Sequence, residues 1–258
     1  MMLLFVPKVG KLAVIFLLPV IGLYNGWKFL PMSPASYLSM NQPIFTYLHH
    51  IAPNRVAGIG AGSFTANLAT EYRYFDTNYY DPLYIRRYGE LVSYANSGSS
   101  AKGLTRSDIT VVRDATVSAD LSFRRERFWD MTGTSSLIVK KGEYNPCRPK
   151  DFLNSKQCPL LWEDASWQVF ERESALPRVY LVHEVIDKNN SGAILSTLFN
   201  PEFDITKTVV IEEPISLSSN PKTESENVQI QTYKSSEVII KTTSQANAFL
   251  VLSDAYVS

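Results

Sequence analysis

The chain has 258 residues and 45% of them are hydrophobic, so it is long and apolar enough for one large or two small domains. Its 25 Lys and Arg residues balance 25 Asp and Glu residues. This balance argues against a nucleic-acid partner, because binding to phosphates needs a basic excess. No motif in the sequence predicts a cofactor or a metal site.

The first thirty residues contain the most apolar stretch of the chain. Residues 12–24 (LAVIFLLPVIGLY) carry no charge, and with their neighbours they approach the about 20 residues that a membrane-spanning helix needs. Lys8 and Lys11 precede the stretch, as the positive-inside rule expects on the cytoplasmic side, and Trp27 suits the membrane interface. We predict a retained transmembrane helix over residues 1–31, which places everything after it outside the cytoplasm. A cleaved signal peptide and a buried core helix are the alternatives.

Helical and strand-like patterns alternate over residues 32–160, which predicts a mixed α/β segment there. The predicted helices are 43–51, 79–95 and 123–131, and the predicted strands are 54–60 and 136–140. Asp81 precedes Pro82, and we expect it to cap the second of these helices. Gly58–Gly62 (GIGAG) follows a strand but lacks the GxGxxG spacing of a dinucleotide-binding loop, so it is interpreted as a plain turn.

The two cysteines, Cys147 and Cys158, lie in the polar segment NPCRPKDFLNSKQCP, and each is next to a proline. Outside the cytoplasm, such a pair is expected to form a disulfide that closes a short loop. Two free thiols are the alternative. A metal site is a weak interpretation, because no second pair of cysteines and no nearby histidine completes it.

Beyond the cysteines the hydrophobic period changes to that of strands. The predicted elements are strands at 167–171, 178–184, 208–212, 227–233, 237–242 and 248–253, with one helix at 192–199. Residues 161–258 are therefore predicted to form a β-rich domain, a mostly antiparallel sheet or sandwich, which makes the whole chain α+β. Because the chain stops directly after a strand and would leave an open edge, we expect this domain to be truncated.

The densest polar and aromatic cluster is NYYDPLYIRRY at residues 78–88. Asn78, Tyr80, Asp81 and Arg87 gather aromatic faces and a guanidinium near the expected helix start, so they are candidate ligand contacts, for example with an anionic lipid headgroup. A purely structural helix cap is the alternative. No constellation of nucleophile, base or paired carboxylates is evident, so no catalytic residue is predicted.

Several segments together resemble a known family. They are NRVAGIG, NYYDPLYIRRYGEL, FWDMTGTSSLIVKK, WQVFERESALPRVYLVHE and FLVLSDAYVS. The set is similar to the C-terminal, extracytoplasmic part of the YfhO family of bacterial membrane proteins, and ALPRVYLV and LVLSDAYVS are its most specific parts. Asn78 stands where the family often has a residue with glycine-like freedom, which is a small departure.

The resemblance implies a parent protein similar to GT-C glycosyltransferases, which modify cell-surface polymers from a lipid-linked sugar. The family's catalytic carboxylates are expected in an early extracytoplasmic loop that this chain lacks. The implied role of this portion is non-catalytic: it positions the acceptor or the donor at a bacterial cell membrane, with membrane lipid, lipid-linked sugar or polymer as partners. A free-standing, membrane-anchored envelope binding or assembly module without an enzymatic parent is the alternative.

Overall fold

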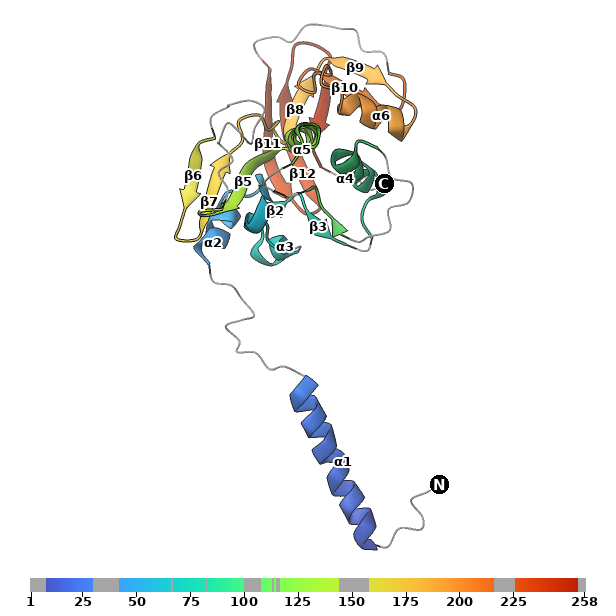
Figure 1. Cartoon of the computed structure of the whole chain (residues 1–258). Helices are drawn as coiled ribbons and strands as arrows, with labels where there is room; N and C mark the ends of the chain where they lie inside the picture. The colour runs from blue at the N-terminus through green and yellow to red at the C-terminus, as the bar shows by residue number, and fades with distance from the viewer. Residues whose placement is uncertain are drawn as a thin grey trace. The chain divides into compact units, whose positions relative to one another are not determined.

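The computed structural model describes residues 8–29, 42–65, 67–81, 83–99, 108–112, 114, 117–143, 158–215 and 226–254. The chain divides into two compact units, Met1–Gln42 and Pro43–Ser258. The fold is mixed α+β with several antiparallel sheets, which confirms the predicted fold class at that level (Figure 1).

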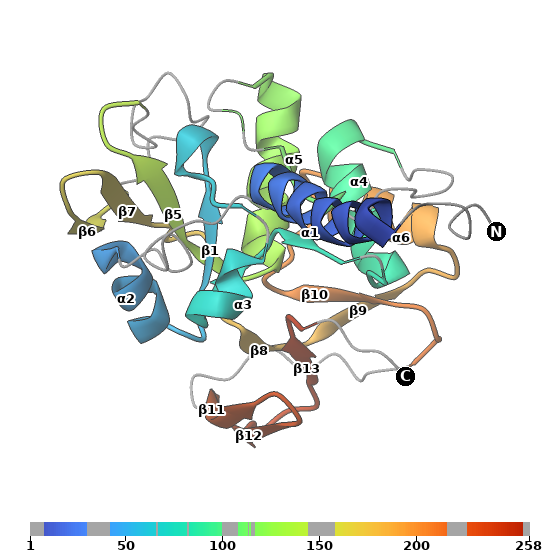
Figure 2. The same cartoon turned by 90° about the horizontal axis from the view of Figure 1, so that it is seen from below.

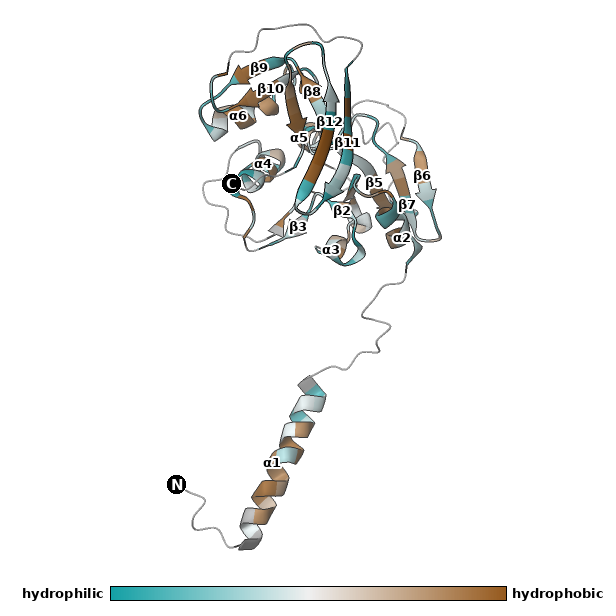
Figure 3. Ribbon diagram, turned by 180° about the vertical axis from the view of Figure 1, so that it is seen from behind, coloured by the Kyte–Doolittle hydropathy of each residue, from teal (hydrophilic) through white to brown (hydrophobic). Residues whose placement is uncertain are grey.

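Helix α1 (Lys8–Phe29) is the described element of the first unit. It has 22 residues, with Pro19 inside it. Large apolar side chains such as Leu12, Phe16 and Leu23 are exposed along it, and Figure 3 shows the hydrophobic colour through its middle. In the described part of the chain, no helix is both long enough and apolar enough to cross a membrane. The transmembrane helix predicted over residues 1–31 is therefore unsupported.

The central sheet of the second unit has five strands in the order β2-β1-β5-β7-β6. β1 runs parallel to β2 and β5, whereas β7 runs antiparallel to β5 and β6. The strands are β1 (Arg55–Gly58), β2 (Phe75–Asp76), β5 (Thr134–Lys140), β6 (Leu160–Glu163) and β7 (Trp167–Glu171). One sheet thus combines strands from both sides of the domain boundary predicted at residue 160.

Strand β5 lies at the centre of this sheet and is covered on both faces. Successive side chains of a strand point to opposite faces. Leu137 and Val139 accordingly pack into one buried cluster, and Ile138 packs into the other. A strand buried on both sides is expected to be a continuous apolar run, which explains why the predicted strand at 136–140 is confirmed.

Helices of the second unit pack on both faces of the sheet or against the helices and strands beside it (Figure 2). They are α2 (Pro43–His50), α3 (Leu68–Tyr72), α4 (Arg86–Ser97), α5 (Ala119–Met131) and α6 (Ser191–Leu198). Ile44 and Leu48 of α2 belong to the cluster around Ile138. Phe128 and Trp129 of α5 belong to the opposite cluster. The predicted helices 43–51, 123–131 and 192–199 are confirmed as α2, α5 and α6, apart from small differences at their ends.

The helix predicted over residues 79–95 begins later than expected. Residues 79 and 80 form β3 (Tyr79–Tyr80), which pairs with β4 (Asp108–Ile109), and α4 begins only at Arg86. Asp81 does not cap α4, because its Oδ1 accepts a hydrogen bond of 2.8 Å from the backbone N–H of Leu83. The helix is confirmed over residues 86–95, and its predicted start was wrong because a tight turn and a strand pairing distant in sequence take up residues 79–83.

In the described part of the chain, the C-terminal strands do not pair into one sheet, which corrects that part of the predicted fold. They form separate two-stranded sheets, β8–β13, β9–β10 and β11–β12. Their bounds are β8 (Val179–Val182), β9 (Glu184–Asp187), β10 (Thr208–Ile211), β11 (Asn227–Lys234), β12 (Glu237–Thr243) and β13 (Phe249–Leu252). β9 and β10 are parallel, because α6 connects them as a crossover helix.

The glycine-rich segment after β1 is a packed turn. A Cβ atom added to Gly62 would lie 2.4 Å from the carbonyl oxygen of Ile138, and one added to Gly58 would lie 2.5 Å from the carbonyl oxygen of Gly62. The backbone N–H of Ser63 donates to the carbonyl of Gly60 at 3.1 Å. Gly62 thus allows a close approach to β5, and Gly58 allows the turn to fold back onto the end of β1, so the interpretation as a plain turn is confirmed.

Candidate functional site

The structure separates the four residues predicted to contact a ligand. Asn78 faces inward with 6% of its surface exposed. Its Oδ1 accepts a hydrogen bond of 3.1 Å from the backbone N–H of Val111, and its own N–H donates to Oδ1 of Asp76 at 2.9 Å. Asn78 therefore fixes the backbone around β3 and β4.

The other three predicted contact residues lie at the surface. Tyr80 is 53% exposed, and its backbone N–H and carbonyl both bond to the side chain of Asn67. Arg87 is also exposed and forms an ion pair of 2.7 Å with Glu212, which directly follows β10. Asp81 holds the turn to Leu83. A ligand role for Asn78, Tyr80, Asp81 and Arg87 stays a prediction.

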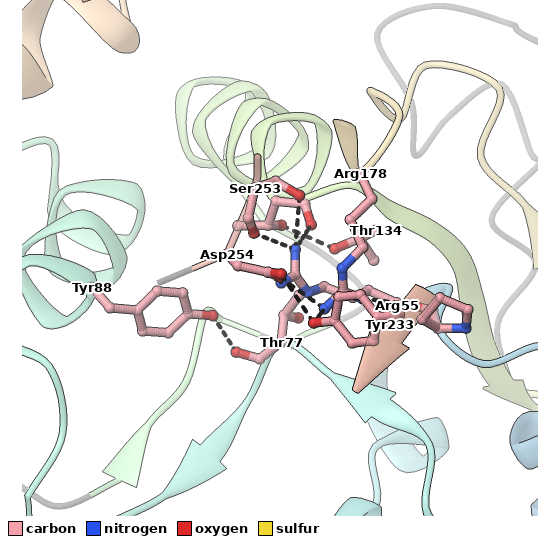
Figure 4. Close-up of polar contacts among 10 residues, drawn as sticks. Arg55, Thr77, Tyr88, Thr134, Arg178, Tyr233, Ser253 and Asp254 are labelled. Carbon is pink, nitrogen blue, oxygen red and sulfur yellow. Dashed lines mark hydrogen bonds and ion pairs between the residues drawn. The ribbon is translucent and has the colours of Figure 1, made fainter. Parts of the chain in front are cut away.

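A second polar cluster joins strand ends that are far apart in sequence. We call it the arginine clasp, and Figure 4 shows it. It consists of Arg55, Arg178, Tyr233, Ser253 and Asp254. Arg55 Nη2 and Arg178 Nη2 both donate to Oδ1 of Asp254, at 2.5 and 2.8 Å. The hydroxyl of Tyr233 accepts from Arg178 and donates to Oδ2 of Asp254 at 3.0 Å.

Backbone pairing places the members of the clasp. β8 and β13 are antiparallel, with Val179 opposite Leu252. The residues just outside this pair, Arg178 and Ser253, are therefore neighbours, and the N–H of Ser253 donates to the carbonyl of Arg178 at 2.9 Å. Arg55 begins β1, and its Nη1 reaches the carbonyl of Ser253 at 2.6 Å across 198 positions of sequence.

The side chains of the clasp are largely buried. Two guanidinium groups share one carboxylate, so the clasp carries one positive charge in excess. The exposed fractions of the side chains are 15% for Arg55, 12% for Arg178 and 21% for Asp254. Burial lowers the pKa of the Arg55 guanidinium, and the nearby Arg178 lowers it further. Burial is also the main cause that raises the pKa of Tyr233, while Arg178 opposes that rise.

Most donors and acceptors of the clasp are directed at one another and at backbone carbonyls, although the buried Nε of Arg178 has no hydrogen-bond partner among the described residues. Arg55 Nη1 donates to the carbonyl of Thr132 at 2.6 Å, and Arg178 Nη1 donates to that of Pro53 at 2.5 Å. The Arg178 guanidinium also lies 4.3 Å from the ring centre of Tyr233. This arrangement fixes strand ends in place. The quoted segments NRVAGIG, ALPRVYLV and LVLSDAYVS contained Arg55, Arg178, Ser253 and Asp254 but not Tyr233, and no local pattern identified any of them as contacts.

Other predicted sites give less. Cys147 lies outside the described residues, so its disulfide with Cys158 stays a prediction. Within the described ranges, no group of three His, Cys, Asp or Glu side chains is placed to hold a metal ion. No family model, no curated protein and no solved structure matches the chain.

Proposed function

We propose that this chain is the membrane-anchored, extracytoplasmic portion of a YfhO-like glycosyltransferase, and that it positions a lipid-linked sugar or a polymer acceptor without performing the chemistry itself. The observation that carries the proposal is the arginine clasp. Three of the segments on which the resemblance rests meet there, through Arg55, Arg178 and Asp254. Residues whose mutual contact holds distant strands together are expected to be retained together in a family.

Helix α1 supports the anchoring part of the proposal. Its exposed apolar side chains lie on every side of the helix, including the consecutive residues Leu17 and Leu18 and, further along, Val20 and Ile21. A helix that is apolar all round is stable only when lipid or protein covers it. Lipid removes this surface from water, so we propose that α1 inserts into the bilayer and keeps the second unit near the membrane.

The anchor is tested with the full chain and vesicles of neutral phosphatidylcholine. We expect the chain to float with the vesicles in a density gradient at high salt, because the attraction is hydrophobic. A double substitution, Leu17→Asn and Ile21→Asn, should leave it at the bottom, whereas Ile215→Asn, at an exposed site of the second unit, should not. Flotation of the double variant, or failure of the unaltered chain to float, would refute the anchor.

The positioning role is tested in the encoding bacterium, by replacing the gene with variants. Tyr80→Ala together with Arg87→Ala should lower glycosylation of the surface polymer, at unchanged protein level in the membrane fraction, because placement of a substrate can contribute several kcal/mol to a rate. Glu212→Ala removes the partner of Arg87 and controls for loss of that ion pair alone. Unchanged glycosylation in a complete gene deletion would instead favour the free-standing envelope module.

A further inference from the structure

The β11–β12 hairpin is attached to the second unit with little apolar burial. None of the residues of β11 or β12 is buried, although both strands are long. The two strands pair with each other, and β11 also lies along β8. By contrast, four consecutive residues of β5 are buried. Apolar burial therefore holds the hairpin less firmly than it holds β5.

A bulge gives the hairpin one apolar face that includes a tyrosine. The register shifts between Ile230 and Thr232, so that Ile230 opposes Ile240 and Tyr233 opposes Val238. Residues 238 and 240 share a face, which brings Tyr233 onto the same face as Ile230 even though they are three positions apart. This face is half-buried, and the bulge directs the Tyr233 hydroxyl into the arginine clasp.

The turn end of the hairpin is fastened at the beginning of β8. Tyr233 lies just before the turn, and Arg178 lies just before β8. The Tyr233 hydroxyl accepts from Arg178 and donates to Asp254. We call these contacts the tyrosine latch. Hydrogen bonds to charged groups contribute more than neutral ones, so the hydroxyl adds substantially to the contacts that the Tyr233 ring makes with Phe75 and the Arg178 guanidinium.

The open end of the hairpin is fastened at the end of β8. Glu226 immediately precedes β11, and its carboxylate lies 2.9 Å from Nε2 of His183, which follows β8. Nδ1 of His183 lies 3.0 Å from the carbonyl oxygen of Asn247, and the hydroxyl of Ser244 donates to Glu226 at 3.1 Å. The side chains of His183 and Glu226 are 10% and 6% exposed. We call these contacts the histidine latch.

We propose that the β11–β12 hairpin is a flap, which leaves β8 as a unit when its two polar latches break, while the five-stranded sheet stays intact. The latches lie at opposite ends of β8, so when one of them breaks the other still holds the hairpin beside β8. Segments with little buried apolar surface open locally at a lower cost than the core. This inference is independent of the role proposed above.

Amide hydrogen exchange on the full chain tests the flap. A two-stranded hairpin alone is only marginally stable in water, so its ladder amides lose protection once it detaches. Tyr233→Phe keeps the ring and removes only the hydroxyl. We expect about tenfold faster exchange in residues 227–234 and 237–243 and no change in β5. His183→Gln should have a similar effect, and the double variant should multiply the two.

Tyr180→Phe is the matched control, because Tyr180 is a half-buried tyrosine on β8 itself that takes no part in either latch. It should leave hairpin exchange unchanged. The proposal is overturned if Tyr233→Phe and His183→Gln both leave hairpin exchange as it was. It is equally overturned if they accelerate β5 and the hairpin alike, since the hairpin then opens only with the whole fold.

Discussion

The five-stranded sheet and the β11–β12 hairpin use similar residues but are held in place in different ways. In β5 the run Leu137–Val139 is buried against helices on both faces. In the hairpin, Ile240 and its neighbours on the apolar face are half-buried, and Ile239 on the other face is exposed. The difference shows that β-branched residues alone do not make a strand part of the core. A strand is buried only where other elements cover both of its faces.

The comparison also explains where the charged clusters lie. The arginine clasp and the histidine latch stand at the ends of β8, where the thinly packed hairpin meets the rest of the unit. Polar contacts carry the attachment where apolar burial is small.

A matched pair of isoleucine substitutions should show the largest difference. Ile138→Ala removes a side chain that is 0% exposed, so we expect a loss of about 4 kcal/mol in the free energy of unfolding. Ile240→Ala removes a half-buried one and should cost about 1 kcal/mol. Urea unfolding followed by circular dichroism measures both. Equal losses of unfolding free energy in the two variants would contradict the claim that β5 is held by a core and the hairpin is not.

Removal of the shared carboxylate in the clasp should have the next largest effect. Asp254→Asn keeps the shape of the side chain but leaves Arg55 and Arg178 without their counter-charge, at an expected cost of about 3 kcal/mol. Asp120→Asn is the control, because Asp120 is exposed and pairs with Arg124 on the helix surface, where ion pairs contribute about 0.5 kcal/mol. If both variants lose the same small amount, the clasp has no structural role.

Tyr74→Phe should have the smallest effect on the free energy of unfolding, and unlike the other substitutions it should stabilise the protein. Tyr74 is buried, and its hydroxyl has no hydrogen-bond partner among the described residues, so its removal should gain about 1 kcal/mol. Burial raises the pKa of Tyr74 above the usual 10.0. Because the folded state keeps this proton longer, stability falls as pH rises above about 10. Unfolding measured from pH 8 to 11 should show a shallower fall in Tyr74→Phe than in the unaltered chain.

Local patterns predicted the elements whose packing follows their own sequence. The apolar run of β5 and the amphipathic residues of α5 needed no distant information. The start of α4 was missed because β4 pairs with Tyr79 and Tyr80 across an intervening helix. The clasp was missed because Arg55 and Asp254 are 199 positions apart, and no spacing rule joins them. The tyrosine latch depends on a one-residue bulge in β11, which alternation alone cannot predict.

Native-state hydrogen exchange of the unaltered chain, measured at rising urea below the unfolding midpoint, tests most directly the claim that polar latches hold the hairpin and a core holds the sheet. The dependence of exchange on urea reports how much surface each opening exposes. We predict that amides of β11 and β12 exchange through an opening with weak urea dependence and low free energy, while those of β5 follow global unfolding. Exchange of both regions with the same free energy and the same urea dependence would contradict the account.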